Sequence, residues 1–326
     1  MVLALAACGS SAPAAATEAP AASTEAPAED VSADKTFVVG ICQLVQHPAL
    51  DAATQGFKDA LTEALGDKVT FQEQNASGDS ATCSLICNQF VSDEVDLIMA
   101  NATASIQAAA SATNTIPILG TSITDYGVAL GVDNWTGVSG TNISGTSDLA
   151  PLDGQAAMVQ ELFPDAKTIG LLYCSGEPNS IFQADSMEAL LTDMGYSVER
   201  YTFADSNDVS SVTANACSNS DVLYIPTDNT AASCTEAINN VALSAGIPIV
   251  AGEEGLASGC GVATLSISYY DLGRATGEMA AEILTEGADV STMEVRFAPA
   301  FTKEYNADIC EALNITVPED YIAIAK

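Results

Sequence analysis

A strand–turn–helix unit that recurs along most of the chain restricts its fold more than any other feature. The first unit opens with the apolar run Phe37 to Ile41, which is too short for a helix and contains β-branched residues. Such a run is typical of a strand buried on both faces. A polar turn follows, and a helical spacing of apolar residues then runs from Asp51 to Phe57. This unit predicts a parallel sheet covered by helices.

The unit is repeated in two halves of similar size. Strands are predicted at 69–74, 95–100, 116–120, 168–173, 197–203, 222–225, 247–250, 262–267 and 294–297. Helices are predicted at 80–92, 180–194, 231–244, 269–285 and 303–313, and a further helix opens at 101–105. Ligands of open α/β sheets bind at the carboxyl ends of the strands. We therefore expect two lobes whose strand ends face one cleft and close around a ligand.

The first 35 residues predict an anchor and a tether. The stretch LAAC at residues 5–8 resembles a bacterial lipobox, in which Cys8 would be lipidated and become the mature N-terminus; the alternative is an accidental alanine-rich start. Residues 9–35 contain the near-repeat TEAPAA/TEAPAE and few large apolar side chains. They predict a disordered tether. The lobes would then be held near a membrane without entering it.

The charge balance argues against nucleic-acid binding. The chain has 43 Asp and Glu against 9 Lys and Arg, which gives a formal net charge of −34. Such a surface repels phosphate backbones and anionic lipid. We expect a solvated acidic surface on an exported protein. No later apolar run approaches the length of a membrane span.

The eight cysteines after Cys8 show no dense disulfide framework and no C-x-x-C motif. Export permits disulfides, so their pairing stays open. Cys83 and Cys87 are four residues apart on a predicted helix, and we interpret them as small buried apolar side chains. A pair at this spacing is a poor metal site without further ligands. We expect no metal and no cofactor.

Six longer stretches carry a family resemblance. They are CQLVQHPALDAATQGF (42–57), TSITD (121–125), SGTSDLAPLDGQ (144–155), ELFPDAKTIGLLYCSGEPNS (161–180), DVLYIPTDNTAAS (221–233) and SISYYDLGRATGEMAAEIL (266–284). In this order they resemble the substrate-binding lipoproteins of bacterial ABC transporters, in particular the group associated with tryptophan and other aromatic amino acids. HPALD and the DNT after a strand are the most specific signals.

The resemblance implies an α/β type I periplasmic-binding fold, a clamshell of two lobes that are each a parallel sheet flanked by helices. We place the crossings between lobes near residues 143, 266 and 292. One lobe would comprise 36–143 and 266–291, and the other 144–265 and 292–326. The family implies an extracytoplasmic, lipid-anchored protein that delivers a small ligand, here an aromatic amino acid, to the membrane permease of an ABC importer. We expect a monomer.

The sequence departs from the family's pattern beside the predicted cleft. Gln46 stands where an acidic residue is common, and Cys42 and Cys174 stand where small or polar residues are common. These positions bear on the identity of the ligand more than on the fold. A different small, non-anionic metabolite is the alternative ligand.

An amino acid ligand needs an acceptor for its ammonium group and donors for its carboxylate. Asp228 follows a buried strand and is the predicted ammonium acceptor, because charged acceptors make stronger hydrogen bonds. Alternatively it caps the next helix, a role that Asn229 or Thr230 could serve equally. No Arg or Lys lies in a predicted cleft turn, so helix N-termini would bind the carboxylate. The candidates, which could also be plain caps, are Thr103, Ala104, Ser105, Asn179 and Ser180.

Further polar and aromatic residues are expected at the cleft. They are Gln43, Gln46, His47, Ser122, Asn229, Tyr269 and Tyr270. His47 could instead fix the turn before a proline, and only one of the two tyrosines would stack on a ligand ring. We expect Trp135 to anchor its own loop and Glu253 and Glu254 to be solvated loop acids.

An enzyme is the main competing class of function. Cys42 and His47 could suggest a thiol nucleophile with its base, but no third orienting group or G-x-S-x-G motif accompanies them. Phosphate-binding and dinucleotide motifs are also missing. We predict a binding protein without catalytic residues. A receptor that feeds a sensor protein stays open as an alternative, because it would use the same clamshell.

Overall fold

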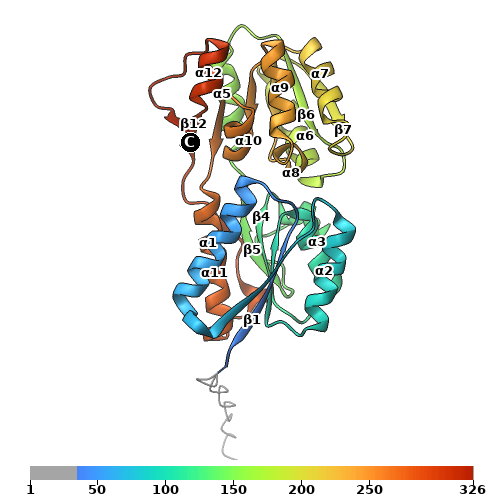
Figure 1. Cartoon of the computed structure of the whole chain (residues 1–326), viewed down its shortest axis with the longest axis vertical. Helices are drawn as coiled ribbons and strands as arrows, with labels where there is room; N and C mark the ends of the chain where they lie inside the picture. Colours follow the sequence, from blue (N-terminus) through green and yellow to red (C-terminus); the bar gives the residue numbers. More distant parts are fainter. Residues whose placement is uncertain (1–34, 326) are drawn as a thin grey trace, which may run out of the picture. The chain divides into compact units, whose positions relative to one another are not determined.

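Two β-sheets, one from each half of the chain, form the framework of the computed structural model, which describes residues 35–325 (Figure 1). The predicted lipobox with Cys8 and the tether up to residue 34 lie outside the described residues. Within residues 35–325, no helix combines the length and the apolar character that a membrane span requires.

The first sheet has six parallel strands in the order β11-β5-β4-β3-β1-β2. They are β1 (Phe37–Gln43), β2 (Val69–Asn75), β3 (Leu97–Asn101), β4 (Ile118–Ile123), β5 (Ile143–Ser147) and β11 (Arg296–Phe297). The helices beside them are α1 (Pro48–Leu65), α2 (Ser80–Ser92), α3 (Thr103–Ala112), α4 (Tyr126–Leu130) and α11 (Tyr269–Glu286), with turns η1 (Gly66–Lys68) and η2 (Val290–Thr292). Ile41 packs with α1 and α11, whereas Cys42 packs with α2 and α3. The sheet is therefore buried on both faces, as its apolar strands predict.

The second sheet has seven strands in the order β13-β12-β10-β9-β8-β6-β7, and all pairs are parallel except β10 with β12. They are β6 (Thr168–Cys174), β7 (Ser197–Phe203), β8 (Val222–Ile225), β9 (Ile249–Ala251), β10 (Ala263–Ser266), β12 (Thr302–Tyr305) and β13 (Ile322–Ala323). The helices are α5 (Leu152–Leu162), α6 (Pro178–Asp193), α7 (Val209–Asn219), α8 (Asn229–Ala232), α9 (Thr235–Ala245), α10 (Glu254–Gly259) and α12 (Ala307–Leu313). Leu171 packs with α5, α6 and α12, and Leu172 with α7 to α10.

The chain passes between the sheets three times, at 148–151, 267–268 and 298–301. We call 35–147 with 269–297 lobe 1 and 152–266 with 302–325 lobe 2. The boundaries predicted near 143 and 292 are wrong by a few residues, because β5 pairs with β4 and β11 pairs with β5. Both strands therefore belong to the first sheet, although their Gly- and Ser-rich or charged sequences do not resemble its apolar strands.

Two predicted helices also differ. The helix predicted at 231–244 is divided into α8 and α9 at Ser233 and Cys234. The helix predicted at 303–313 begins only at Ala307, because Thr302–Tyr305 pairs antiparallel with β10 as β12. Asn306 then caps α12 by accepting the Ile309 N–H at 3.2 Å.

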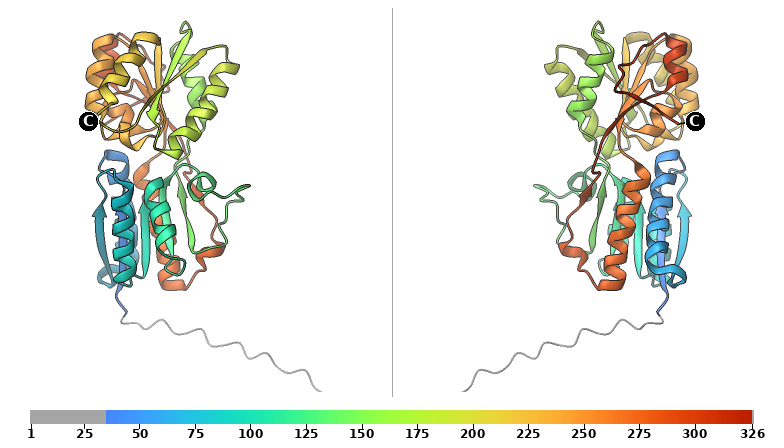
Figure 2. Two further views of the ribbon diagram at one scale, coloured as in Figure 1. Left: turned by 90° about the vertical axis from the view of Figure 1, so that its right-hand side faces the viewer. Right: turned by 90° about the vertical axis from the view of Figure 1, so that its left-hand side faces the viewer.

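Helices α1 and α11 lie side by side against the first sheet (Figure 2). Residues at their N-termini line a cavity. A Cβ atom on Gly273 would lie 1.9 Å from the Ala53 carbonyl oxygen, so only glycine permits the approach of these backbones. The pair fixes the positions of His47, which precedes α1, and of Tyr269, which begins α11.

Candidate functional site

A cavity of about 460 Å³ lies between the lobes, at the carboxyl ends of strands from both sheets. Lobe 1 lines it with the turn after β1 and the starts of α2 and α3; lobe 2 lines it with the turns after β6, β7 and β8. Its volume is within the range of small-molecule binding sites. The cleft predicted from the repeated units is therefore present.

Asp228, the predicted ammonium acceptor, is buried beside this cavity at 1% exposure. One carboxylate oxygen accepts the Ala231 N–H at 2.8 Å and so caps α8; the other accepts the Cys174 N–H at 2.7 Å. The capping role foreseen as the alternative is thus real. Burial, and then the charge of Glu177, raise the pKa of Asp228 well above its usual range.

Glu177 is a site residue that the sequence reasoning missed. Its Oε1 accepts from the Thr230 N–H and hydroxyl, both at 2.8 Å. Its Oε2 accepts from the Asn229 N–H at 3.0 Å and from the Asn229 side chain at 2.7 Å. The carboxylate therefore joins the turn after β6 to the start of α8. The only signal in the sequence is an acidic residue directly before the proline that opens α6.

The carboxylates around the cleft have no cationic partner. Within residues 35–325, no Lys or Arg forms an ion pair with Asp228, Glu177, Asp148 or Glu253, and all four are buried. Burial raises the pKa of Asp148 to about 6 and that of Glu253 to about 7. Glu253 is not the solvated loop acid that we predicted, because it caps α10 through the Gly255 and Leu256 N–H groups.

The two candidate sites for a carboxylate differ. At the start of α6, the Asn179 side chain donates to Glu177 at 3.1 Å and to the Thr227 carbonyl at 3.0 Å, and Ser180 is hydrogen-bonded to Asp228. At the start of α3 no side chain caps the helix, and the N–H groups of Thr103 and Ala104 donate to no acceptor in the described chain. Ala104 lines the cavity.

Ser105, in α3, and Ser122, in β4, differ in their contacts. The Ser105 hydroxyl lies 3.7 Å from the Cys42 sulfur and 3.6 Å from the Cys83 sulfur, so it faces the core of lobe 1. Ser122 is buried and its hydroxyl has no partner. Ala102, which precedes α3, has φ of 85° and Ser122 has φ of 56°, values uncommon for residues other than glycine. Backbone strain of this kind is concentrated at functional sites.

His47 contacts lobe 2 directly. Its Nε2 lies 3.4 Å from the Asn229 Oδ1. Because the Asn229 amide nitrogen donates to Glu177, its oxygen faces the imidazole, and Nε2 must carry the hydrogen. Nδ1 is then a buried acceptor without a partner. Burial lowers the pKa of His47. A second contact between lobes joins the Gln183 amide to the Thr124 hydroxyl at 3.3 Å.

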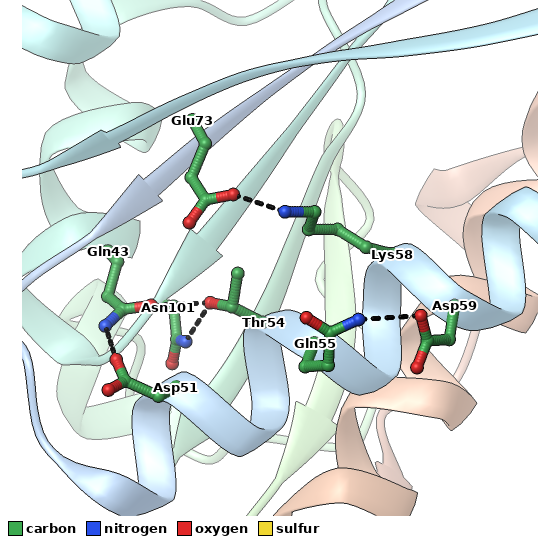
Figure 3. A network of polar contacts seen from close by, with 8 residues as sticks. All are labelled: Gln43, Asp51, Thr54, Gln55, Lys58, Asp59, Glu73 and Asn101. Carbon is green, nitrogen blue, oxygen red and sulfur yellow. Dashed lines mark hydrogen bonds and ion pairs between the residues drawn. The ribbon is translucent and has the colours of Figure 1, made fainter.

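Gln43 and Gln46 line a different cavity, of about 420 Å³, on lobe 1 alone. Figure 3 shows the Gln43 side chain turned toward α1, where it donates to Asp51 at 2.6 Å and accepts from the Thr54 hydroxyl at 2.6 Å. Gln46 is exposed at the rim. Neither residue lines the cavity between the lobes.

Tyr269 and Tyr270 line a third cavity, of about 310 Å³, beside the N-termini of α1 and α11. The buried Tyr269 hydroxyl donates to Asp148 at 2.9 Å, and the partly exposed Tyr270 hydroxyl to Asp59 at 3.0 Å. Trp135 stacks on Tyr126 with a centroid distance of 5.8 Å, in agreement with its predicted anchoring role.

The cysteines of the described chain are unpaired. Cys83 and Cys87 are fully buried in the apolar core of lobe 1, which confirms the interpretation of this pair. Cys42 lies in the same core, so it is not at the cleft surface, whereas Cys174 lines the cavity between the lobes.

Comparisons with known proteins agree with this architecture. A tyrosine-binding protein of Clostridioides difficile is 39% identical over 280 residues, which are 85% of this chain and 81% of that protein. A domain from Streptococcus pneumoniae in complex with L-Trp is 31% identical, with a TM-score of 0.83 over 87% of this chain and 97% of the other.

A ligand-free, open structure of a Clostridium difficile substrate-binding protein with adhesive properties is 38% identical, yet its TM-score is only 0.68, over 89% of this chain and 100% of the other. The present structure, in which His47 and Gln183 join the lobes, is thus nearer to the tryptophan complex than to the open form. These similarities confirm the type I periplasmic-binding fold. The family model described as ABC transporter substrate binding protein matches residues 38–326. This chain therefore belongs to the substrate-binding proteins of ABC transporters.

Proposed function

We propose that this chain is the extracytoplasmic binding component of an ABC importer and captures an aromatic amino acid between its lobes. The observation that carries the proposal is the buried pair Asp228 and Glu177, which has no cation beside it. An α-ammonium group would supply the missing charge. The tyrosine-binding relative and the tryptophan complex support an aromatic side chain.

Asp228 is the proposed ammonium acceptor, because a carboxylate that accepts two backbone N–H groups still has free lone pairs. His47, Asn229, Ser122 and the start of α3 complete the proposed site. Gln43, Gln46, Ser105 and Tyr270 are left out of it, because their side chains turn elsewhere, and Asn179 and Ser180 support Asp228 and Glu177 instead.

Family membership supports a small-molecule ligand and a membrane permease as partners, and no catalytic role. The lipid anchor on Cys8 rests on the LAAC stretch alone. Mass spectrometry of the chain purified from a bacterial membrane fraction tests it: a lipidated N-terminal Cys8 is expected, and an unmodified residue there would contradict the anchor.

Calorimetric titration of the ligand-stripped full chain against the twenty amino acids tests the ligand. Saturable binding of Trp, Tyr or Phe at micromolar or lower concentration is expected. If none of the twenty binds, the amino acid assignment is wrong. Mass spectrometry of small molecules that co-purify with the chain would then identify the class of ligand.

A further inference from the structure

Three thiols meet in the core of lobe 1, where β1 packs against α2. Cys42 lies on β1, Cys83 and Cys87 lie one turn apart on α2, and each of the three is 0% exposed. The Cys42 side chain is hydrogen-bonded to both of the other thiols. The Ser105 hydroxyl of α3 lies 3.7 Å from the Cys42 sulfur and 3.6 Å from the Cys83 sulfur. The fold therefore brings thiols together that are far apart in the sequence.

Helix α2 packs closely on β1. Gly40 lies two residues before Cys42, on the same face of the strand. A Cβ atom on Gly40 would lie 2.6 Å from the Phe90 ring of α2, so helix and strand approach each other closely here. Cys83 and Cys87 themselves are spaced i and i+4 on the helix, which puts their Cβ atoms about 5–6 Å apart, whereas a disulfide needs about 3.5–4.5 Å. A bond among the three thiols without distortion of the helix therefore involves Cys42.

We propose that Cys42 and Cys83 form a disulfide bond when the chain folds in an oxidising compartment outside the cytoplasm. Cys83 is the partner because it shares the Ser105 contact with Cys42. Within residues 35–325, Cys87 forms no hydrogen bond with Ser105. The inference rests on the extracytoplasmic location in the proposed function and does not depend on the identity of the ligand.

The reaction is a thiol–disulfide exchange. The two cysteine thiols are oxidised, a bond forms between their sulfurs, and their two protons and two electrons pass to a disulfide oxidant. This oxidant, oxidised glutathione or the disulfide of an oxidoreductase, is reduced to two thiols. Because both cysteine sulfurs are fully buried in the folded chain, the oxidant reaches them only before α2 packs against β1. The bond therefore forms during folding.

The bond would stabilise the wall of the cavity between the lobes. The turn after β1 and the start of α2 both line this cavity, and they lie directly after Cys42 and directly before Cys83. The bond would close a loop of about 40 residues and so restrict the unfolded chain. The thermal unfolding midpoint of the oxidised chain should therefore be roughly 10 °C above that of the reduced chain.

Peptide mapping tests the pairing directly. The full chain is refolded from denaturant in a buffer of reduced and oxidised glutathione, its remaining thiols are alkylated, and its peptides are analysed by mass spectrometry without reduction. A peptide pair that links Cys42 to Cys83 is expected. Free Cys42 and Cys83, or a link from Cys42 to Cys87, would overturn the proposal.

The same map of the chain from a bacterial membrane fraction, alkylated before lysis, tests the compartment. The linked pair is expected there too. If the pair forms on refolding but is absent from cells, the extracytoplasmic location is wrong, and with it the formation of the bond in the cell. A failure of every amino acid to bind would contradict the proposed ligand and leave this pairing unaffected.

Variants give an independent readout, because each is measured both oxidised and reduced and the loss of packing then cancels. Cys83→Ala should abolish the difference in unfolding midpoint between the two states. Cys87→Ala is the matched control, since it removes an equally buried thiol from the same helix and should keep the difference. Equal differences in the two variants would contradict the assignment of Cys83 as the partner.

Discussion

The two sides of the cleft differ in how their buried polar groups are satisfied. In lobe 2, Asp228, Glu177 and Glu253 each accept hydrogen bonds at both carboxylate oxygens and cap a helix. In lobe 1, the Ser122 hydroxyl and His47 Nδ1 are buried without partners. Buried polar groups are normally paired. The unpaired groups of the described chain also include Asn101 Oδ1 in lobe 1 and the Ser220 and Thr264 hydroxyls in lobe 2, and of all these only Ser122 and His47 belong to the proposed site. The proposed site thus has buried carboxyl groups on the lobe 2 side and unused hydrogen-bonding capacity on the lobe 1 side.

Removing the charge of lobe 2 should have the largest effect. Asp228→Asn should cost about 2–5 kcal/mol of binding free energy for an aromatic amino acid, because a buried ammonium group would lose its charged partner. Calorimetric titration measures this loss. Asp221→Asn is the matched control, since Asp221 also accepts two backbone N–H groups in lobe 2 but is exposed. If both variants lose similar affinity, the loss comes from a destabilised helix or turn and not from a lost contact between Asp228 and the ligand.

The second prediction concerns pH. Burial raises the pKa of Asp148 to about 6 and of Glu253 to about 7, so both stabilise the fold fully below about pH 4, where they are neutral in either state. That contribution is lost as pH rises through 6 and 7, and each carboxyl accounts for roughly 3 kcal/mol at 1.4 kcal/mol per pKa unit. The unfolding free energy of the ligand-free chain should therefore fall from pH 5 to pH 8.

His47 in lobe 1 changes the pH dependence of stability in the opposite direction. Burial lowers its pKa, so its contribution is present above its ordinary pKa and is lost as pH falls. The contribution of one histidine is smaller than that of the two carboxyl groups together. The unfolding free energy should therefore still fall as pH rises. Urea denaturation at each pH, compared with the Glu253→Gln variant, checks the assignment. The unfolding free energy of the variant should fall less with pH than that of the parent chain. An unchanged pH dependence would show that Glu253 does not cause the loss of stability.

The third prediction is a smaller effect: one substitution should raise the stability of the ligand-free chain and weaken ligand binding. Ser122→Ala removes a buried hydroxyl without a partner, so the ligand-free chain should gain about 1 kcal/mol of stability. The same change should weaken amino acid binding about tenfold. Ser220→Ala removes another unpartnered buried hydroxyl, from lobe 2 outside the site, and should stabilise without affecting affinity. If both variants bind the amino acid more weakly, the proposal that Ser122 contacts the ligand is wrong.

The fold was largely predictable because most strands are buried on both faces. The apolar run Val222–Ile225 is buried throughout and has the predicted bounds. The failures lie at the edge of a sheet or one strand in from it. Thr302–Tyr305 is half-buried and polar, and only its pairing with β10 makes it a strand. Likewise β11 consists of two residues, and its place beside β5 depends on a contact 150 residues away in sequence.

The candidate site was predictable in position but not in side-chain direction. Gln43 follows β1 as expected, yet Asp51 and Thr54, eight and eleven residues later, turn it away from the cleft. Glu177 escaped notice because its partners lie 52 and 53 residues along the chain. Local sequence patterns predict where a strand ends. Hydrogen-bond partners from other parts of the chain decide which polar groups at that end remain free to bind a ligand.

The smallest effect should come from the loop of lobe 1 that carries Trp135, the only tryptophan of the chain. Its ring stacks on Tyr126, whose hydroxyl donates to the Gly120 carbonyl in the core of lobe 1, and it lines none of the three cavities. Trp135→Phe should therefore cost only about 0.5–1.5 kcal/mol of stability and leave amino acid affinity unchanged. In the parent chain, tyrosine binding should barely change tryptophan emission, because the stack lies within one lobe. A large emission change on binding would mean that lobe 1 rearranges internally, and the contrast between a preformed lobe 2 and a rigid but unsatisfied lobe 1 would then be wrong.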